Sequence, residues 1–442
     1  MTFTARNISD FNSPIDQNDI GLEMVRLITE LYPICRSITG NGVRETLRIL
    51  RKHIPIDIHN VPTGTQVFDW TVPREWSIKD AYIKNSRGER VIDFRKSNLH
   101  VVNYSVPIKR SMSLAELRPH LFTLPNYPDW VPYRTSYYHE NWGFCLSHNK
   151  LMELRDEEYE VCIDSSLEPG FLTYGEYFLP GESADEVLFS CHVCHPSLAN
   201  DNLSGIALAL FLAKHLSGIK RRYSYRFLFI PGTIGSITWL SQHEDEALRI
   251  KHGLVLASVG AGDKFSYKKS RRGNAEIDQA VLSVLRHSGK PYDIFDFSPY
   301  GYDERQFCSP GFNLPVGCLM RTPNGRFPEY HTSADNLDFV QPSLLAESFA
   351  VALAIVSLLE GNVIYANQNP KCEPQLGKRG LYRTMGGVEG GVNELALLWV
   401  LNLSDGTHSL LDIAERSGCA FDTIKRAADL LQQHGLLRQV SL

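Results

Sequence analysis

The sequence lacks the features that mark secreted and membrane proteins. Its first residues, MTFTARNISDFNSPIDQNDIG, contain no basic segment followed by an apolar one, and no run of about 18 apolar residues stands out in the 442 residues. Long blocks of one charge are also missing, since 45 basic and 50 acidic side chains give a net charge of −5. We therefore expect a cytoplasmic protein without a membrane partner, and charge alone nominates no other partner.

The cysteines do not form the framework of a disulfide-stapled domain. There are nine, an odd number spread from Cys35 to Cys419, which favours reduced thiols. Cys191 and Cys194 have the C-x-x-C spacing of redox pairs, but no second such pair exists to complete a four-cysteine zinc site. A redox role stays an alternative, although Cys191 lies at the end of an apolar strand pattern.

The pattern of apolar residues predicts three regions. Helices are expected within residues 16–53, and residues 61–165 consist of short alternating segments rich in Tyr, Trp and Thr, which indicate an inserted β-rich domain. After the insert, buried strands are expected at residues 186–193, 223–232, 253–260 and 313–320, and helices at residues 204–218 and 344–361. This alternation predicts an α/β core with a mostly parallel sheet sandwiched by helices.

The C-terminal region has the order of a winged helix, with three short helices followed by a strand. Residues 392–442 carry six acidic and four basic side chains, whereas a DNA reader needs a basic surface, so we favour a packing or interaction role. The expected domains are the core at residues 1–60 and 166–375, the insert at 61–165 and the winged helix at 376–442.

Two polar stretches carry the candidate chemistry. In FSCHVCHPSLANDNLSG, His192 and Asp201 flank a turn at the carboxyl end of a predicted strand, and His331 lies in FPEYHTSADNLDF after a later strand. Imidazole and carboxylate groups from loops at strand ends are what a zinc site in an α/β sheet requires. The plainer alternative is that each is a hydrogen-bonded loop residue.

These motifs, in the order HVCHPSLANDNLSG, FIPGTIGS, YGYDERQF and EYHTSADNLDF, resemble the zinc-dependent aminopeptidase superfamily, which includes glutaminyl cyclases. More narrowly, the chain is similar to an aminopeptidase-like family of unassigned function with an inserted β domain and a C-terminal winged helix. The resemblance implies that His192, Asp201 and His331 bind metal and that Asp335 is structural. Asp303 matches an aspartate that those enzymes follow with histidine, where Glu304 stands here.

The sequence departs from active aminopeptidases at two places. Gly232 and Thr233 stand where the resemblance implies two glutamates, one a general base and one a zinc ligand, and Ala257 and Ser258 stand where an aspartate is expected. The resemblance therefore implies one zinc ion and leaves a second short of ligands. Hydrolysis would need another proton acceptor, for which Glu304 is slightly preferred to Glu329. His195 is a weaker fourth ligand, a proton carrier or a hydrogen-bond partner of the turn.

Arginines and aromatic residues mark candidate substrate contacts. Arg36 and Arg44 flank a Gly-rich turn, and Arg134 and Tyr137 lie in the aromatic segment PYRTSYYHENWGF of the insert. Arginine forks suit carboxylate or phosphate groups, which suggests an acidic substrate, although surface solvation or a packed β core would use the same residues.

The leading hypothesis is a zinc-dependent hydrolase that cleaves an amide bond of a small peptide or aminoacyl conjugate, and the sequence is compatible with a homo-oligomer. One rival is a catalytically inactive aminopeptidase fold that binds a ligand or a protein, which Gly232 and Thr233 favour. A second rival is a DNA-binding regulator, against which the acidic winged helix argues.

Overall fold

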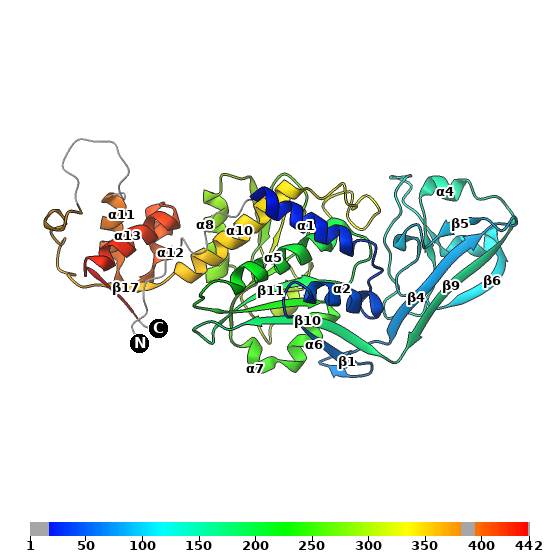
Figure 1. The fold of residues 1–442 in the computed structure, drawn as a ribbon, viewed down its shortest axis with the longest axis horizontal. Coiled ribbons are helices and arrows are strands. Elements are labelled where there is room, and N and C mark those ends of the chain that lie inside the picture. The colour runs from blue at the N-terminus through cyan, green and yellow to red at the C-terminus, as the bar shows by residue number, and fades with distance from the viewer. Residues whose placement is uncertain (1–16, 382–393, 441–442) are drawn as a thin grey trace. The chain divides into compact units, whose positions relative to one another are not determined.

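The computed structural model describes residues 17–381 and 394–440. These residues divide into two compact units. One contains residues 17–275 and 291–350, and the other contains residues 276–290, 351–381 and 394–440. Each unit is described by itself below (Figure 1).

The first unit is built on an eight-stranded sheet whose centre is parallel. In spatial order the strands are β1 (Asp57–Pro62), β10 (Phe171–Leu179), β12 (Ser224–Ile230), β11 (Glu186–His192), β13 (Ile250–Leu256), β16 (Val316–Met320), β14 (Phe265–Lys268) and β15 (Tyr292–Phe295). Neighbours from β12 to β16 run parallel, whereas β1 and β10 pair antiparallel at one side and β14 pairs antiparallel with β16 at the other. The predicted α/β class is confirmed.

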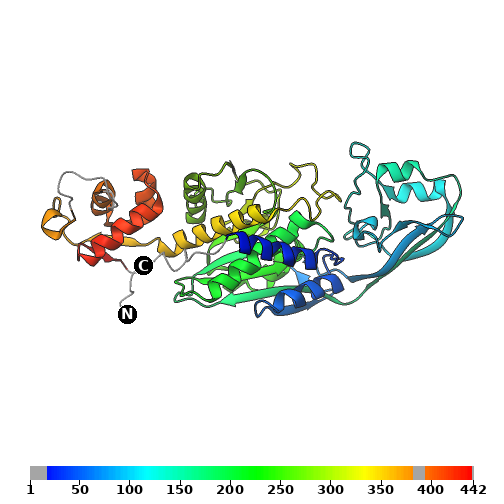
Figure 2. The same ribbon diagram turned by 45° about the horizontal axis from the view of Figure 1, so that its top comes forward.

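Helices cover this sheet because its central strands are apolar on both faces. Every residue of β11 and of β12 is buried, which requires packing against both faces. Apart from the β-rich insert and the first part of α10 (Pro342–Gly361), the helices of this unit are α1 (Gln17–Leu31), α2 (Asn41–Arg51), α5 (Gly205–Ser217), α6 (Ile234–Gln242), α7 (Glu244–Ala247) and α9 (Glu304–Phe307). The almost entirely apolar helix α5 contacts the central strands, and α1 lies beside it in both views (Figures 1 and 2).

A buried ion-pair network ties three neighbouring strands of the sheet together. The guanidinium of Arg226 on β12 donates to Glu186 on β11, with Nε and Oε2 2.7 Å apart, and also pairs with Glu176 on β10. All three side chains are at most 9% exposed. The opposite charges compensate one another inside the sheet, so the loss of one member would leave a buried charge unpaired.

The β-rich insert interrupts the chain between β1 and β10. Its main sheet has the antiparallel order β5 (Arg90–Asp93), β4 (Glu75–Lys84), β9 (Glu158–Glu168) and β6 (Ile108–Ser113). Shorter elements complete it: β2 (Gln66–Val67), β3 (Trp70–Thr71), η2 (Asn98–His100), α3 (Leu114–Leu117), η3 (Arg118–His120), β7 (Leu121–Phe122), β8 (Phe144–Cys145) and α4 (His148–Met152). Buried residues such as Ile83, Phe144 and Val161 give the insert a hydrophobic cluster of its own.

A short segment of the insert is bonded to the loop that carries His331. The Tyr133 N–H donates to the His331 carbonyl at 2.7 Å, and the Ser333 N–H donates to the Val131 carbonyl at 2.8 Å. The Ser333 hydroxyl in turn accepts from the Val131 N–H at 2.9 Å. These bonds fix residues 131–133 of the insert against a loop that follows β16.

The second unit contains α8 (Glu276–His287), the later part of α10 (Pro342–Gly361) and a winged helix. Helices α11 (Glu394–Leu403), α12 (Leu410–Ser417) and α13 (Phe421–Gln433) accompany a three-stranded antiparallel sheet. Its order is β18 (Asp405–Ser409), β17 (Ile364–Asn367) and β19 (Leu437–Gln439), and the short helix η5 spans Gly377–Arg379. The central strand of this sheet therefore comes from the segment directly after α10.

Helix α10 is an exception to the expectation that the chain contains no long apolar segment. It is 20 residues long with a mean hydropathy of 1.9, so its length and composition alone would suffice to cross a membrane. About two thirds of its apolar window, 67%, is buried within the protein, as in the core helix of a globular domain.

The Arg226 network generates a prediction for stability. An Arg226→Met variant would leave the carboxylates of Glu176 and Glu186 buried without their cation, so we expect the free energy of unfolding to fall by about 3–5 kcal/mol. Urea unfolding followed by circular dichroism measures this change. The exposed Arg118→Met serves as the control and should leave stability unchanged, and equal effects of the two substitutions would contradict the prediction.

Candidate metal centre

The centre lies at the carboxyl end of β11, in the middle of the sheet. Strands β12, β11 and β13 run parallel, so their carboxyl ends face the same edge, where α/β proteins place their functional groups. His192 is the last residue of β11. The chain then turns through His195 and the short helix η4 (Ala199–Ser204), which contains Asp201, and α5 begins at Gly205.

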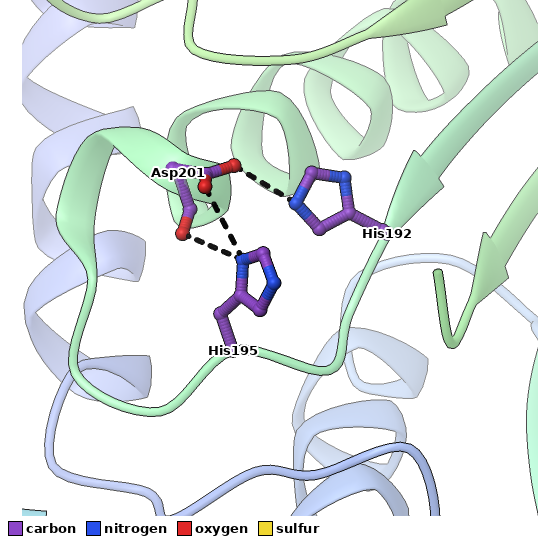
Figure 3. A group of neighbouring side chains, drawn as sticks. All are labelled: His192, His195 and Asp201. Carbon is purple, nitrogen blue, oxygen red and sulfur yellow. Dashed lines mark hydrogen bonds and ion pairs between the residues drawn. The ribbon is translucent and has the colours of Figure 1, made fainter. Parts of the chain in front are cut away.

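Two imidazoles of this loop meet at the carboxylate of Asp201 (Figure 3). His192 Nε2 lies 2.9 Å from Asp201 Oδ1, and His195 Nδ1 lies 3.4 Å from Asp201 Oδ2. The three residues can offer ligand atoms that all lie within 4.8 Å of one another. His195, which the sequence suggested only as a weaker fourth ligand, therefore belongs to this group.

His331 reaches the same carboxylate from the loop after β16. Its Nε2 lies 3.1 Å from Asp201 Oδ2, and the ring of Tyr330 stacks on its imidazole with centroids 3.9 Å apart. The backbone of His331 has a φ of 55°, in the left-handed region that non-glycine residues rarely adopt. The structure thus brings together the three residues expected from the sequence to bind metal, with His195 beside them.

The protonation states around Asp201 are those of metal ligands. Burial by itself would raise the pKa of Asp201, but the neighbouring imidazoles of His195, His192 and His331 outweigh burial and hold that pKa well below its usual value. Burial lowers the pKa of His192 and of His331. At neutral pH these two imidazoles are therefore neutral beside an ionised carboxylate, as metal coordination requires.

Two buried atoms at the centre have no hydrogen-bond partner. They are Asp201 Oδ2 and His331 Nε2, which face one another without meeting hydrogen-bond geometry. A buried carboxylate is unfavourable unless a cation or hydrogen-bond donors compensate its charge. Nitrogen and oxygen donors of this kind suit Zn²⁺, so the residues present fit a zinc ion.

Backbone and side-chain bonds fix Asp201 from behind. The carboxylate of Asp335 accepts the N–H of Asn200 at 2.6 Å and the N–H of Asp201 at 2.9 Å. Burial raises the pKa of Asp335 to about 7, against the effect of these donors. Asn202, which the sequence did not single out, accepts the N–H groups of Gly205 and Ser258, both at 3.2 Å. Asp335 and Asn202 therefore support the turn that carries Asp201, and Asn202 Nδ2 also lies 3.3 Å from His192 Nδ1.

The loop after β12 carries no carboxylate. A Cβ added to Gly232 would lie 3.6 Å from the Cβ of His192, so this loop lies directly against the centre. The Thr233 N–H donates to Asp303 Oδ1 at 2.6 Å, and burial raises the pKa of Asp303 to about 6. An aspartate from another loop is thus bonded to the position where a glutamate was expected. Beside it, Tyr302 stacks on the ring of His192 with centroids 5.1 Å apart.

The two candidate proton acceptors differ in their surroundings. Glu304 is fully buried and forms an ion pair with Lys268, whose ammonium also donates to the carbonyl of Tyr300 at 2.9 Å. Glu329 is half-buried and lies two residues before His331. The Lys268 pair gives Glu304 a structural partner, whereas Glu329 lies in the loop of a candidate ligand.

The arginines expected to contact substrate are bonded to the protein. Arg36 is buried and donates to the carbonyls of His195 at 2.8 Å and Leu31 at 2.7 Å, which holds the ligand loop in place. Arg44 pairs with Glu75, with 3.0 Å between Nη1 and Oε2. Arg134 is exposed and lies over the ring of Phe122 at 4.8 Å.

Tyr137 is linked to the centre through Tyr133. The two hydroxyls are 3.0 Å apart, and the ring of Tyr133 packs edge-on against His195 and His331, with centroids 5.2 and 5.1 Å apart. The aromatic segment of the insert therefore forms one wall of the metal centre. Tyr133 was not singled out from the sequence, because its place depends on the pairing of residues 131–133 with the His331 loop.

The structure gives the redox alternative little chemical support. Cys191 and Cys194 are both buried as free thiols. Burial raises the pKa of Cys191 well above its usual value and that of Cys194 to about 12. Because the thiolate is the reactive form, these cysteines are poor nucleophiles at neutral pH.

Comparison with protein families and known proteins identifies relatives along the whole chain. Residues 25–362 match a family described as a domain of unknown function, DUF4910, and residues 363–439 match a winged helix-turn-helix family. The chain is 57% identical over 426 residues to a protein of Clostridium acetobutylicum, covering 96% of this chain and 98% of the relative. That relative is named as a candidate polysaccharide biosynthesis protein with an aminopeptidase-like domain.

Solved structures give the same picture of the fold. A crystal structure of a candidate peptidase from Clostridium acetobutylicum has a TM-score of 0.94 at 55% identity, with 98% of this chain and 100% of that chain covered. A zinc aminopeptidase from Bacillus subtilis has a TM-score of 0.55 at 14% identity and covers 76% of this chain and 94% of its own. At that identity the likeness shows the fold alone, which is aminopeptidase-like as the sequence motifs predicted.

The role of Asp335 yields a prediction. An Asp335→Ala variant would leave the N–H groups of Asn200 and Asp201 buried without acceptors, so we expect the free energy of unfolding to fall by about 2–6 kcal/mol. Asp335→Asn keeps an oxygen for one donor and should lose less. Urea unfolding checks both against the exposed control Asp338→Ala. If Asp335→Ala were as stable as the wild type, Asp335 would not be the support of the ligand turn.

Proposed function

This chain belongs to the DUF4910 family, and we propose that it is a zinc-dependent hydrolase of aminopeptidase-like fold. The observation that carries the proposal is the convergence of three imidazoles on the buried carboxylate of Asp201. The substrate we propose is an amide bond of a small peptide or aminoacyl conjugate. The aminopeptidase-like fold supports this substrate class, and the Clostridium relative is named for an aminopeptidase-like domain and for polysaccharide biosynthesis.

His192, Asp201 and His331 would hold one zinc ion, with His195 as a fourth ligand or as a proton carrier. A zinc ion bound there would act as a Lewis acid and would lower the pKa of a water molecule. The unpartnered Asp201 Oδ2 and His331 Nε2 support this set of ligands. The residues available for coordination supply one site, and Gly232 and Thr233 add no carboxylate for a second.

The chain must also supply a group that takes a proton from the attacking water. We propose Glu329 for this role, because its loop carries His331 and the described residues show no ion pair that commits its carboxylate elsewhere. Glu304 was slightly preferred from the sequence, but its ion pair with Lys268 favours a structural role. Tyr133 and Tyr302 would form the walls that orient the substrate, because each packs on an imidazole of the centre.

A second candidate function is an inactive aminopeptidase fold that binds a ligand or a protein. The absence of a carboxylate at residues 232–233 and the ion-paired Glu304 favour it. DNA binding is a weaker candidate, because Lys425 on α13 is paired with Asp429 and acidic residues outnumber basic ones in the winged helix.

The metal site can be tested directly. Elemental analysis of the purified protein should find about one zinc per chain, since the ligands suffice for one ion. His192→Ala and Asp201→Ala should each reduce zinc to below about half an equivalent. Arg134→Ala, a control outside the centre, should retain the full amount. A protein that takes up no zinc even after incubation with it would contradict the proposal.

Hydrolysis is tested with a panel of aminoacyl amides and short peptides on the zinc-loaded protein. We expect Glu329→Gln to lower kcat by about 100-fold or more while zinc content stays constant, because it removes the proton acceptor. Glu304→Gln should act mainly by lowering thermal stability, since it breaks the Lys268 pair. No turnover in a zinc-loaded wild type would favour the ligand-binding alternative, and an unchanged rate in Glu329→Gln would reject Glu329 as the base.

A further inference from the structure

Arg305 is a partly buried arginine whose guanidinium has hydrogen-bond donors that the described residues do not use. Its Nη2 donates to the Thr233 hydroxyl at 3.0 Å, whereas its Nε is buried and has no hydrogen-bond acceptor. Within residues 17–381 and 394–440, no carboxylate oxygen lies within 4.0 Å of its guanidinium nitrogens. An unsatisfied charged donor of this kind calls for a partner that the chain itself does not supply.

Several other arginines of this unit have stronger acceptors. A carboxylate accompanies the guanidinium of the buried Arg226 and Arg321 and of the half-buried Arg44 and Arg90. Arg36 donates to two carbonyls and supports the ligand loop. For Arg305, the acceptor found among the described residues is the neutral hydroxyl of Thr233.

The position of Arg305 places this charge beside the metal centre. It lies on α9, three residues after Tyr302, whose ring stacks on His192. Its acceptor Thr233 follows Gly232, where an added Cβ would lie 3.6 Å from the Cβ of His192. The guanidinium is therefore attached to the loop that borders the candidate ligands.

Asp303 is an acidic side chain that interacts electrostatically with Arg305. Its Oδ1 accepts the Thr233 N–H at 2.6 Å and the Ser236 hydroxyl at 3.0 Å, so the carboxylate is already bonded to the start of α6. Arg305 and Asp303 interact through space, but they form no ion pair. The remaining donors of Arg305 are still available.

We propose that Arg305 binds an anionic oxygen group of the substrate, a carboxylate or a phosphate, next to the metal centre. The inference rests on the proposed function, because it takes the centre to be the place where the substrate reacts. It narrows the substrate to an acidic conjugate, such as a dipeptide bound through its carboxylate or an aminoacyl phosphate ester. A guanidinium fork suits both groups. The inference assigns to Arg305 the preference for an acidic substrate that the sequence suggested for Arg36, Arg44 and Arg134.

Binding of small anions to the full-length, zinc-loaded protein tests this inference without any hydrolysis. Glutarate probes for a carboxylate site, inorganic phosphate for a phosphate site, and the neutral glutaramide is the control, each titrated by isothermal calorimetry. We expect one anion to bind and glutaramide not to bind. Arg305→Gln should weaken the anion by about tenfold to 100-fold, as the loss of a charge-assisted hydrogen bond predicts.

Matched variants separate a specific site from general charge and from misfolding. Arg134→Gln removes an exposed arginine and should leave anion binding unchanged, and Arg305→Lys keeps the charge without the fork and should give an intermediate loss. Unchanged melting temperatures show that the variants fold. Binding of neither anion, or equal losses in Arg305→Gln and Arg134→Gln, would overturn the inference. Arg305-dependent binding in a protein that hydrolyses no amide would reject the proposed catalysis and keep the anion site.

Discussion

The carboxylate of Asp201 is the group around which this protein is organised. It is fully buried, it is ionised, and three imidazoles from two separate loops are directed at it. Such a charge is unfavourable in a protein interior unless a cation or several donors compensate it. Asp335 holds the backbone of the turn, so the carboxylate keeps its place although no arginine or lysine among residues 17–381 and 394–440 pairs with it.

The surroundings of the centre differ from what the resemblance to aminopeptidases implies. The loop of Gly232 and Thr233 leaves room beside His192, and the segment from Tyr302 to Arg305 occupies that side of the site. In that segment an aromatic ring, two acids and an arginine lie within four residues. The side of the centre next to Gly232 and Thr233 therefore carries a guanidinium group instead of the expected carboxylates.

Local patterns in the sequence predicted the fold and the candidate ligands for a clear physical reason. The spacing of apolar residues predicts buried strands and helices. His192 and Asp201 stand at the end of such a strand. His331 lies in a polar stretch after a later strand, and the resemblance to aminopeptidases implied that all three residues bind metal. These features depend on short stretches of chain, which a sequence displays directly.

The remaining features depend on contacts between distant segments. Nothing near Glu304 in the sequence indicates that Lys268, at the end of β14, would pair with it. Arg36 looked like a substrate contact, but it serves the His195 loop 159 residues away. Strand β17 joins the winged-helix sheet for the same kind of reason, since its partners β18 and β19 follow later in the chain.

The central claim is that a metal ion is bound by Asp201 and its imidazoles. X-ray absorption at the zinc edge of the loaded, full-length protein tests it most directly. Nitrogen and oxygen ligands at about 2.0–2.1 Å, with the scattering of imidazole rings and with imidazole scattering reduced in His331→Ala, are the result that we predict. Sulfur ligands at about 2.3 Å, which would assign the metal to the C-x-x-C pair, or a spectrum of fully hydrated zinc would contradict the account.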